Sequence, residues 1–307
     1  MEEKNSKERV IHQKSVSQIH EYLGFEKPTH PLITILDTAK MSYGEDFIGV
    51  KIISDLYCIA LKDGSCGLDY GRNHYDFSEG VLIFTGPGQV YSVRKAQELN
   101  EINGWMIYFH PDLIRNTPLG SRIDQYSFFG YDVHEALHLS DQEQSIITNC
   151  VGLIQSEIKE RIDGHSQQVL ASNIELLLNY CLRYYERQFN TRAAQHQDIV
   201  SKVESLLKSY YEQEQLVEAG PPSLDYLADN VALSPYYLSD LLKKETGRTA
   251  KDHINDFLIS KAKNLLLRSE DSISGIAFNL GFNYPHYFSR LFKNKTGMTP
   301  QEYRQLN

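Results

Sequence analysis

Two stretches near the C-terminal end place polar side chains three and four residues apart, beside an apolar stripe. The polar sets are Tyr236, Ser239, Asp240 and Lys243 in the first stretch, and His286, Ser289, Arg290 and Lys293 in the second. The apolar stripes are Leu238, Leu241 and Leu242, and Phe288, Leu291 and Phe292. Because side chains at this spacing share one face of an α-helix, each stretch predicts a helix with one buried face and one exposed polar face.

The polar faces carry groups that a helix in the major groove of DNA uses to contact base edges and phosphates. Arg290 could donate two hydrogen bonds to a guanine, and Asp240 could accept one from the amino group of a cytosine. Ser289 and Lys293 fit contacts with the phosphate backbone better. The alternative is an ordinary solvated helix surface, and the duplication of the pattern argues against it.

The two stretches belong to an internal repeat with an offset of 50 residues. Residues 235–250 and 285–300 are identical at eight of sixteen positions. A short apolar segment of helical character precedes each copy, so the repeated element is a helix, a tight turn and a second helix. We expect the first unit at about residues 224–247 and the second at about residues 273–296.

Local signals mark the ends of these helices. Ser234 stands before Pro235, which predicts a side-chain cap followed by a proline at the first helical position. Gly281 falls in the second turn, where glycine adopts a left-handed backbone easily. Gly247 and Gly297 are stop signals at equivalent positions. The expected caps of the helices that follow are Thr249 and Thr299.

Residues 250–268 form a candidate linking helix between the two units, because Ile254, Leu258, Ala262 and Leu266 recur at helical spacing. At about 1.5 Å per residue, its ~19 residues span ~28 Å. Successive major-groove segments on one face of B-DNA lie ~34 Å apart. A single chain could therefore place two recognition helices one helical turn of DNA apart.

The first part of the chain has a different pattern. From about residue 32 to about residue 110, the sequence consists of short runs that are apolar or that alternate between apolar and polar residues, separated by turn residues. This pattern predicts the strands of a barrel or sandwich. Two amphipathic helices follow within about 140–190, and Ser140 is the expected cap of the first. Aromatic residues crowd the stretch 179–189, and we interpret this stretch as a subunit interface.

The length of 307 residues is enough for two domains, each with its own core. The polar segment 191–198 is the expected linker, so we place one domain at 1–195 and the other at 196–307. The net charge of −9 is distributed unevenly, because residues 221–307 hold 11 Lys plus Arg against 9 Asp plus Glu. The acidic excess therefore lies in the first part of the chain, and the mild basic balance of the C-terminal part is compatible with a nucleic-acid partner.

Composition excludes several other classes of protein. No run approaches the ~18 to 20 apolar residues of a membrane span, and the first residues are polar, so we expect no membrane partner and a cytoplasmic location. The four cysteines are scattered without a CxxC pair, which gives no support for a disulfide framework or a zinc knuckle.

Residues 221–307 resemble the DNA-binding domain of the AraC/XylS family of transcription regulators. The matching segments are LADNVALSPYYLSDLLKKETG and IAFNLGFNYPHYFSRLFKNKTGMTPQEYR. The resemblance implies that two sets of residues read two grooves. These sets are Tyr236, Ser239 and Asp240 for one groove, and Asn283, His286, Ser289 and Arg290 for the next. Asp240 departs from the Arg or Gln of many relatives, and its negative charge could serve mainly to repel wrong sites.

The first domain is more loosely similar to the cupin-like sensing domain of the same family. The segment EGVLIFTGPGQVYSV, residues 79–93, resembles the strand, turn and strand that close such a barrel. The resemblance implies a pocket for a small effector inside the barrel and a pair of helices used for dimerisation.

Some polar residues of the first domain could bind an effector. They are Arg72, Asn73, Tyr75 and Tyr91, although roles in turns and at barrel edges explain them as well. Three histidines are also candidates for a metal site, namely His30, His74 and His110. They lack the close spacing of clustered metal ligands, so we expect neither a metal nor another cofactor.

These features predict an α+β protein of two domains. The first is a cupin-like β-barrel with a helical dimerisation pair, and the second is an all-α domain with two helix-turn-helix units joined by a long helix. We interpret the chain as a dimeric regulator of transcription, more often an activator than a repressor, that binds double-stranded DNA under the control of a small-molecule effector.

Two alternatives remain open. The first is a DNA-binding protein without an effector, whose first domain only dimerises or contacts RNA polymerase. The second is a cupin-type enzyme with a DNA-binding tail, which would need clustered histidine and carboxylate ligands that the sequence does not display. No nucleophile or phosphate-binding motif is evident either, so we do not expect an enzyme.

Overall fold

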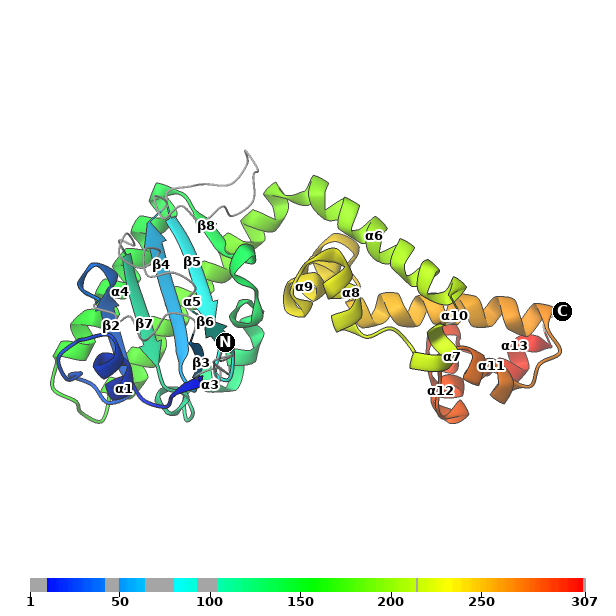
Figure 1. Ribbon diagram of the computed structural model, residues 1–307, viewed down its shortest axis with the longest axis horizontal. Coiled ribbons are helices and arrows are strands. Elements are labelled where there is room, and N and C mark those ends of the chain that lie inside the picture. Colours follow the sequence, from blue (N-terminus) through cyan, green and yellow to red (C-terminus); the bar gives the residue numbers. More distant parts are fainter. Residues whose placement is uncertain (1–9, 42–49, 64–79, 93–103, 214, 306–307) are drawn as a thin grey trace, which may run out of the picture. The chain divides into compact units, whose positions relative to one another are not determined.

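The computed structural model describes residues 10–41, 50–63, 80–92, 104–213 and 215–305. The chain divides into two compact units, Met1–Thr191 and Arg192–Asn307. The first unit combines sheets with helices, and the second is entirely helical where it is described (Figure 1).

The first unit contains strands whose central members are the most apolar runs of the sequence. The strands are β1 Val10–Gln13, β2 Ile33–Asp37, β3 Lys51–Ser54, β4 Tyr57–Asp63, β5 Gly80–Thr85, β6 Val90–Ser92, β7 Gly104–Phe109 and β8 Leu137–Leu139. A five-stranded sheet has the order β2-β7-β4-β5-β8, and all of its pairs are antiparallel. Ile59, Leu82 and Ile107 lie in its three central strands and are fully buried.

A second sheet of three strands has the order β1-β3-β6. β1 runs parallel to β3, whereas β6 runs antiparallel to it. Within the described ranges the strands form these two sheets and do not close into a barrel. The sheet expected from residues 32–110 is thus present, and β1 and β8 extend it beyond that range because strands of three or four residues leave little pattern in a sequence.

Helices cover the five-stranded sheet. The helices of this unit are α1 Val16–Tyr22, α3 Pro118–Arg122, α4 Asp141–Lys159 and α5 Ser166–Thr191. Short 3-10 turns span Thr38–Lys40, Pro111–Leu113, Ile123–Gln125, Ser127–Gly130 and Val133–Glu135. α4 and α5 pack on each other and against β8, on one side of the sheet (Figure 1). As expected, Ser140 caps α4, and its partner Glu143 completes a capping box.

The aromatic stretch 179–189, which the sequence suggested as a subunit interface, contributes mainly to the core of its own domain. Tyr184, Tyr185 and Phe189 are at most 6% exposed, and the ring of Tyr185 stacks on that of Phe128 with centroids 5.3 Å apart. Burial within one chain removes these three side chains from the surface that a second subunit could contact.

The second unit consists of helices. They are α6 Ala193–Glu212, α7 Gln215–Ala219, α8 Leu224–Val231, α9 Pro235–Thr246, α10 Ala250–Arg268, α11 Ile273–Asn279, α12 Pro285–Thr296 and α13 Pro300–Arg304. α6 packs on α8 and α9, while α10 packs on α11, α12 and α13 and also contacts α9. The unit therefore repeats one arrangement of a long helix followed by two shorter ones.

The segment 191–198 is not an extended linker. α5 ends at Thr191 and α6 begins at Ala193, so a single break at Arg192 separates two helices. The segment contains Ala and Gln, which favour helix, and polarity alone does not distinguish a linker from an exposed helical turn.

Candidate nucleic-acid interface

The turns of the two helix-turn-helix units begin with the same backbone conformation. Ala232 occupies the left-handed position of the first turn with φ 55°, and Gly281 occupies that of the second with φ 80°. In both turns the next amide donates to a carbonyl five residues earlier, at 3.1 and 3.0 Å. These two positions are 49 residues apart, whereas the helices that follow are 50 residues apart. The second turn is therefore longer by one residue.

This extra residue changes how the second helix of each unit begins. The side chain of Ser234 caps α9 by accepting a hydrogen bond from the amide of Tyr237, as expected. At the start of α12 the cap position is held by Tyr284, and no side chain caps the helix. Asn283 and Tyr284, which precede Pro285 in the longer turn, are both exposed, whereas Leu233 and Ser234, which precede Pro235, are half-buried and buried.

The apolar stripe of each second helix faces inward. Leu238, Leu241 and Leu242 are fully buried. In the second helix-turn-helix unit Phe288 and Phe292 are fully buried, and Leu291 is half-buried. Burial of this stripe turns the opposite, polar face of α9 and α12 outward.

The predicted DNA-contacting residues lie on these outward faces. Exposed are Tyr236, Lys243, Asn283, His286, Arg290 and Lys293, and half-buried are Ser239, Asp240 and Ser289. The hydroxyl of Ser289 donates to the carbonyl of Pro285 at 3.1 Å within α12. Its oxygen can still accept a hydrogen bond, but its proton is already engaged.

An aromatic cluster at the start of α12 was not singled out from the sequence. Tyr284 and Tyr287 are 60% and 48% exposed. The rings of His286 and Tyr287 lie 4.3 Å apart, and the guanidinium of Arg290 lies 5.3 Å from the centre of the Tyr287 ring. The cluster orients Arg290, because a guanidinium is attracted to the face of an aromatic ring. The signal was the run of aromatic residues around Pro285 in NYPHY.

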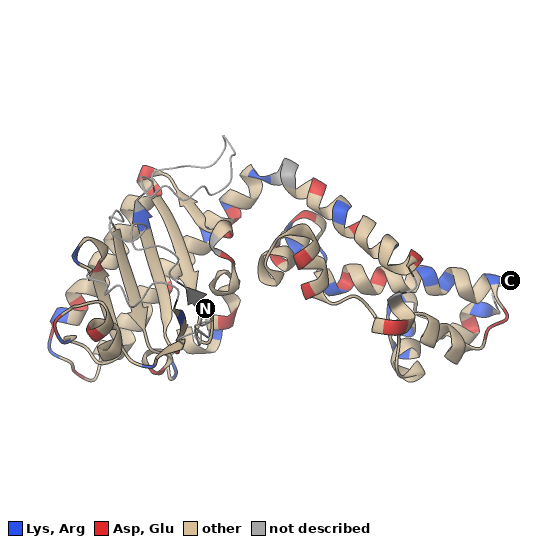
Figure 2. Cartoon of the chain, viewed as in Figure 1, with Lys and Arg blue, Asp and Glu red and all other residues tan. Residues whose placement is uncertain are grey.

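Charge along the linking helix is divided. Its acidic residues, Asp252 and Asp256, lie in the first half of α10 beside Lys251, whereas the second half carries only the cations Lys261, Lys263 and Arg268 (Figure 2). The ammonium group of Lys261 lies 4.2 Å from the centre of the Tyr211 ring. α10 has the expected bounds and the expected cap, since the side chain of Thr249 accepts a hydrogen bond from the amide of Asp252.

The residues proposed for an effector are placed only in part. Arg72, Asn73 and Tyr75 lie outside the described residues, as does His74. Tyr91 belongs to β6, where its backbone is paired with Ile52.

The two described histidines of the candidate metal set have local partners. The amide of Leu32 donates to Nδ1 of His30, and the amide of Asp112 donates to Nδ1 of His110, both at 3.2 Å. Burial lowers the pKa of His30. Among the described residues, no group of three His, Cys, Asp or Glu side chains could hold a metal ion. No helix in those ranges is long and apolar enough to cross a membrane.

Comparison with known proteins places the second unit in a family. A family model described as a helix-turn-helix domain matches residues 227–306. An HTH-type transcriptional activator RhaS from Escherichia fergusonii is 41% identical over 83 residues, which cover 27% of this chain and 30% of that protein. The chain thus matches less than a third of the length of this relative.

A longer sequence match extends beyond the second unit, and part of the chain is similar to a solved structure. The arabinose operon regulatory protein of Escherichia coli is 28% identical over 227 residues, covering 73% of this chain and 72% of that protein. The C-terminal domain of AraT, a response regulator from Geobacillus stearothermophilus, is 30% identical with a TM-score of 0.32, covering 36% of this chain and 85% of that one. These sequence matches identify the C-terminal unit of this chain as an AraC-type helix-turn-helix domain.

Proposed function

We propose that this protein is a sequence-specific, DNA-binding regulator of transcription whose single chain reads two short DNA elements. The observation that carries the proposal is the duplicated unit. Each copy buries an apolar stripe, turns a polar face outward on α9 or α12, and is joined to the other by the 19-residue helix α10. Such faces have the size and the chemistry to enter major grooves one helical turn apart.

We further propose that the regulator is an activator controlled by an effector. RhaS is described as a transcriptional activator, and the longer match extends beyond the DNA-binding domain to a regulator of an arabinose operon. In this proposal a small molecule binds a cupin-like first domain and changes how the second domain is presented to DNA or to RNA polymerase. The effector must bind one arrangement better than the other, because equal affinity would shift no equilibrium.

Dimerisation is proposed to use the outward surfaces of α4 and α5. Exposed apolar side chains there are Leu153, Val169, Leu176 and Leu182. Val169 and Leu176 are seven residues apart, so they lie on one face of α5. A role in regulation requires no catalysis, and we propose no enzymatic activity.

Selection of bound duplexes from a random pool tests the central proposal. The unaltered chain should enrich two short elements about one helical turn apart. Arg290→Ala should relax the sequence preference at one element only, by about 1–3 kcal/mol at the contacted base pair. Arg268→Ala is the matched control, because Arg268 is an exposed arginine at the end of α10 and belongs to neither polar face.

Two outcomes would contradict the proposal. If the chain enriches no sequence and its affinity depends steeply on salt, binding is only electrostatic attraction to phosphate. If Arg268→Ala and Arg290→Ala weaken binding equally and relax no position, α12 does not read bases.

A further inference from the structure

The position that Lys295 holds in α12 is occupied by Glu245 in α9, 50 residues earlier. Each of these side chains is paired with the long helix that precedes its own unit. Oε1 of Glu245 lies 3.5 Å from Nδ1 of His196 on α6, and Lys295 pairs with acidic residues of α10. One repeat position thus contacts the preceding long helix in both helix-turn-helix units, through side chains of opposite charge.

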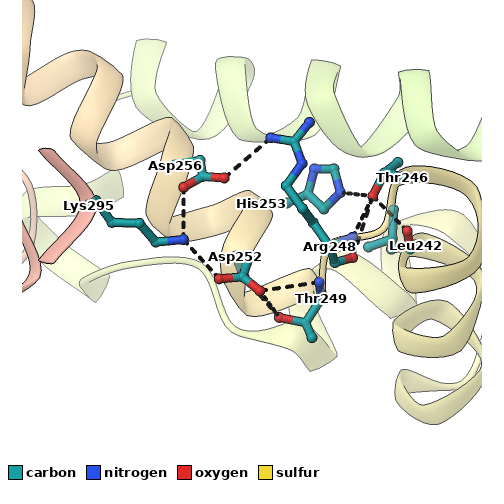
Figure 3. Close-up of polar contacts among 8 residues, drawn as sticks. All are labelled: Leu242, Thr246, Arg248, Thr249, Asp252, His253, Asp256 and Lys295. Atoms are coloured by element: carbon teal, nitrogen blue, oxygen red, sulfur yellow. Dashed lines mark hydrogen bonds and ion pairs between the residues drawn. The ribbon is translucent and has the colours of Figure 1, made fainter.

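The pairing of Lys295 is made to two carboxylates at once. Its Nζ lies 2.9 Å from Oδ1 of Asp252 and 3.0 Å from Oδ1 of Asp256, one turn further along α10 (Figure 3). The side chains of these three residues are between 29% and 39% exposed. A network of this kind holds its geometry better than a single exposed ion pair.

The same carboxylates also bind residues that follow α9 in the first helix-turn-helix unit. Nη1 of Arg248, in the turn after α9, lies 3.3 Å from Oδ2 of Asp256. Oδ2 of Asp252 accepts a hydrogen bond from the hydroxyl of Thr249 at 2.7 Å, at the cap of α10 (Figure 3). Asp256 is therefore shared by a cation from the first helix-turn-helix unit, Arg248, and a cation from the second, Lys295.

We propose that Asp252, Asp256, Arg248 and Lys295 form a carboxylate clamp. The clamp sets the orientation of α12 relative to the first helix-turn-helix unit, and thereby the spacing of the two DNA elements. The proposal rests on the proposed function, because spacing matters only if one chain reads two elements. Its residues are positioning residues, and they act through α9 and α12 without reading bases themselves.

The physical reason is effective concentration. When the first helix-turn-helix unit is bound to DNA, the second binds its element as an intramolecular step. A rigid connection that points α12 toward the correct groove raises the local concentration of α12 there. A loosened clamp spreads the orientations of α12, which weakens binding at the optimal spacing and relaxes discrimination against other spacings.

Duplexes of different spacing test this inference with the full chain. The set contains both selected elements at the selected spacing, the same elements with one base pair added or removed, and one element alone. Lys295→Met and Asp256→Asn should each weaken binding at the selected spacing by about three- to tenfold, within the range of such couplings. Both should shrink the penalty for the altered spacings and leave the affinity for one element nearly unchanged. Lys295→Arg keeps the positive charge and should therefore keep the spacing preference of the unaltered chain.

The two variants distinguish the clamp from direct contact of Lys295 with phosphate. If Lys295 only meets phosphate, Lys295→Met weakens every duplex and lowers the salt dependence, while Asp256→Asn removes a negative charge and tightens every duplex. That pair of opposite effects, with the spacing preference intact, would overturn the proposal.

A second measurement needs no DNA. Spin labels on Lys244→Cys and Asn294→Cys, equivalent exposed positions of α9 and α12, report the distance between the two helices. All labelled variants also carry Cys66→Ser, and the other three cysteines, Cys58, Cys150 and Cys181, are buried. Asp256→Asn and Lys295→Met should broaden the distance distribution, whereas Lys261→Met, a lysine of α10 outside the clamp, should not.

These results separate the two proposals. An unchanged distribution in both clamp variants overturns the clamp whatever the DNA results. A broadened distribution in a chain that selects no two-element site leaves the clamp standing as a structural device and removes the proposed function.

Discussion

The carboxyl group of Asp252 has two tasks, since it caps α10 and binds Lys295. Hydrogen bonds from Lys295 and from Thr249 lower its pKa from 3.8 to about 2. A carboxyl group whose pKa is lower in the folded chain stabilises the fold above its unfolded pKa, and this contribution is lost as the pH falls through the folded pKa.

Acid unfolding should therefore depend on Asp252. We expect Asp252→Asn to lower the free energy of unfolding of the second unit near pH 5, and the difference from the unaltered chain to shrink between about pH 4 and about pH 2. Denaturant titrations across this range measure it. Lys295→Met should reduce the same pH dependence, because it removes the donor with the largest effect on Asp252. A difference that stays constant down to pH 2 would contradict the assignment.

Arg290 shows why side-chain type alone does not describe a contact surface. The sequence identified it as a cation on an exposed face, but its direction is set by the ring of Tyr287 three residues earlier. A guanidinium held against a ring loses less freedom when it binds a base edge than one that is free in solvent. Tyr287 therefore belongs to the candidate interface.

At the scale of elements, the turns of the two units differ in what surrounds them. A Cβ at Gly281 would lie 2.6 Å from the carbonyl oxygen of Leu216 and 2.9 Å from the backbone of Gly220. Gly281 thus allows the segment that ends α7 to approach the second turn. At Gly247, which also has a positive φ, a Cβ would meet no atom within 4 Å.

This pair of glycines separates backbone strain from steric contact. Gly247→Ala should cost about 1 kcal/mol, the price of a left-handed alanine. Gly281→Ala should cost about 3 kcal/mol or more, because strain and a collision with backbone add up. Denaturant titrations of both variants measure the difference. Equal costs would mean that α7 does not pack on the second turn.

At the scale of the whole molecule, each compact unit has its own core. Leu177 of α5 is fully buried in the first unit, and Leu258 of α10 is 1% exposed in the second. Two separate cores predict two unfolding events, since each compact unit can unfold by itself.

Calorimetry on the full chain tests this expectation. Leu177→Ala and Leu258→Ala each remove a buried leucine, which costs about 2–5 kcal/mol. Each substitution should lower the temperature of one transition and leave the other in place. A single transition that both substitutions lower equally would show that the chain unfolds as one cooperative body.

The sequence by itself determined the local features of the second unit. The caps Ser234, Thr249 and Thr299 are confirmed, as are the stripe of Leu238, Leu241 and Leu242 and the bounds of α10. These features depend on residues at most a few positions apart, so their signals are contained in a short window. The base contacts of the outward residues stay predictions.

Only the tertiary structure decided what depends on distant residues. It buried Tyr184 and Tyr185 in their own domain, paired β1 with β3, and joined Asp256 to Lys295, 39 residues away. A residue's type and neighbours in sequence say that it is aromatic or charged, and they do not say which surface of the fold it will meet. That partner is chosen by the packing of whole elements, where burial and charge pairing across the chain are satisfied together.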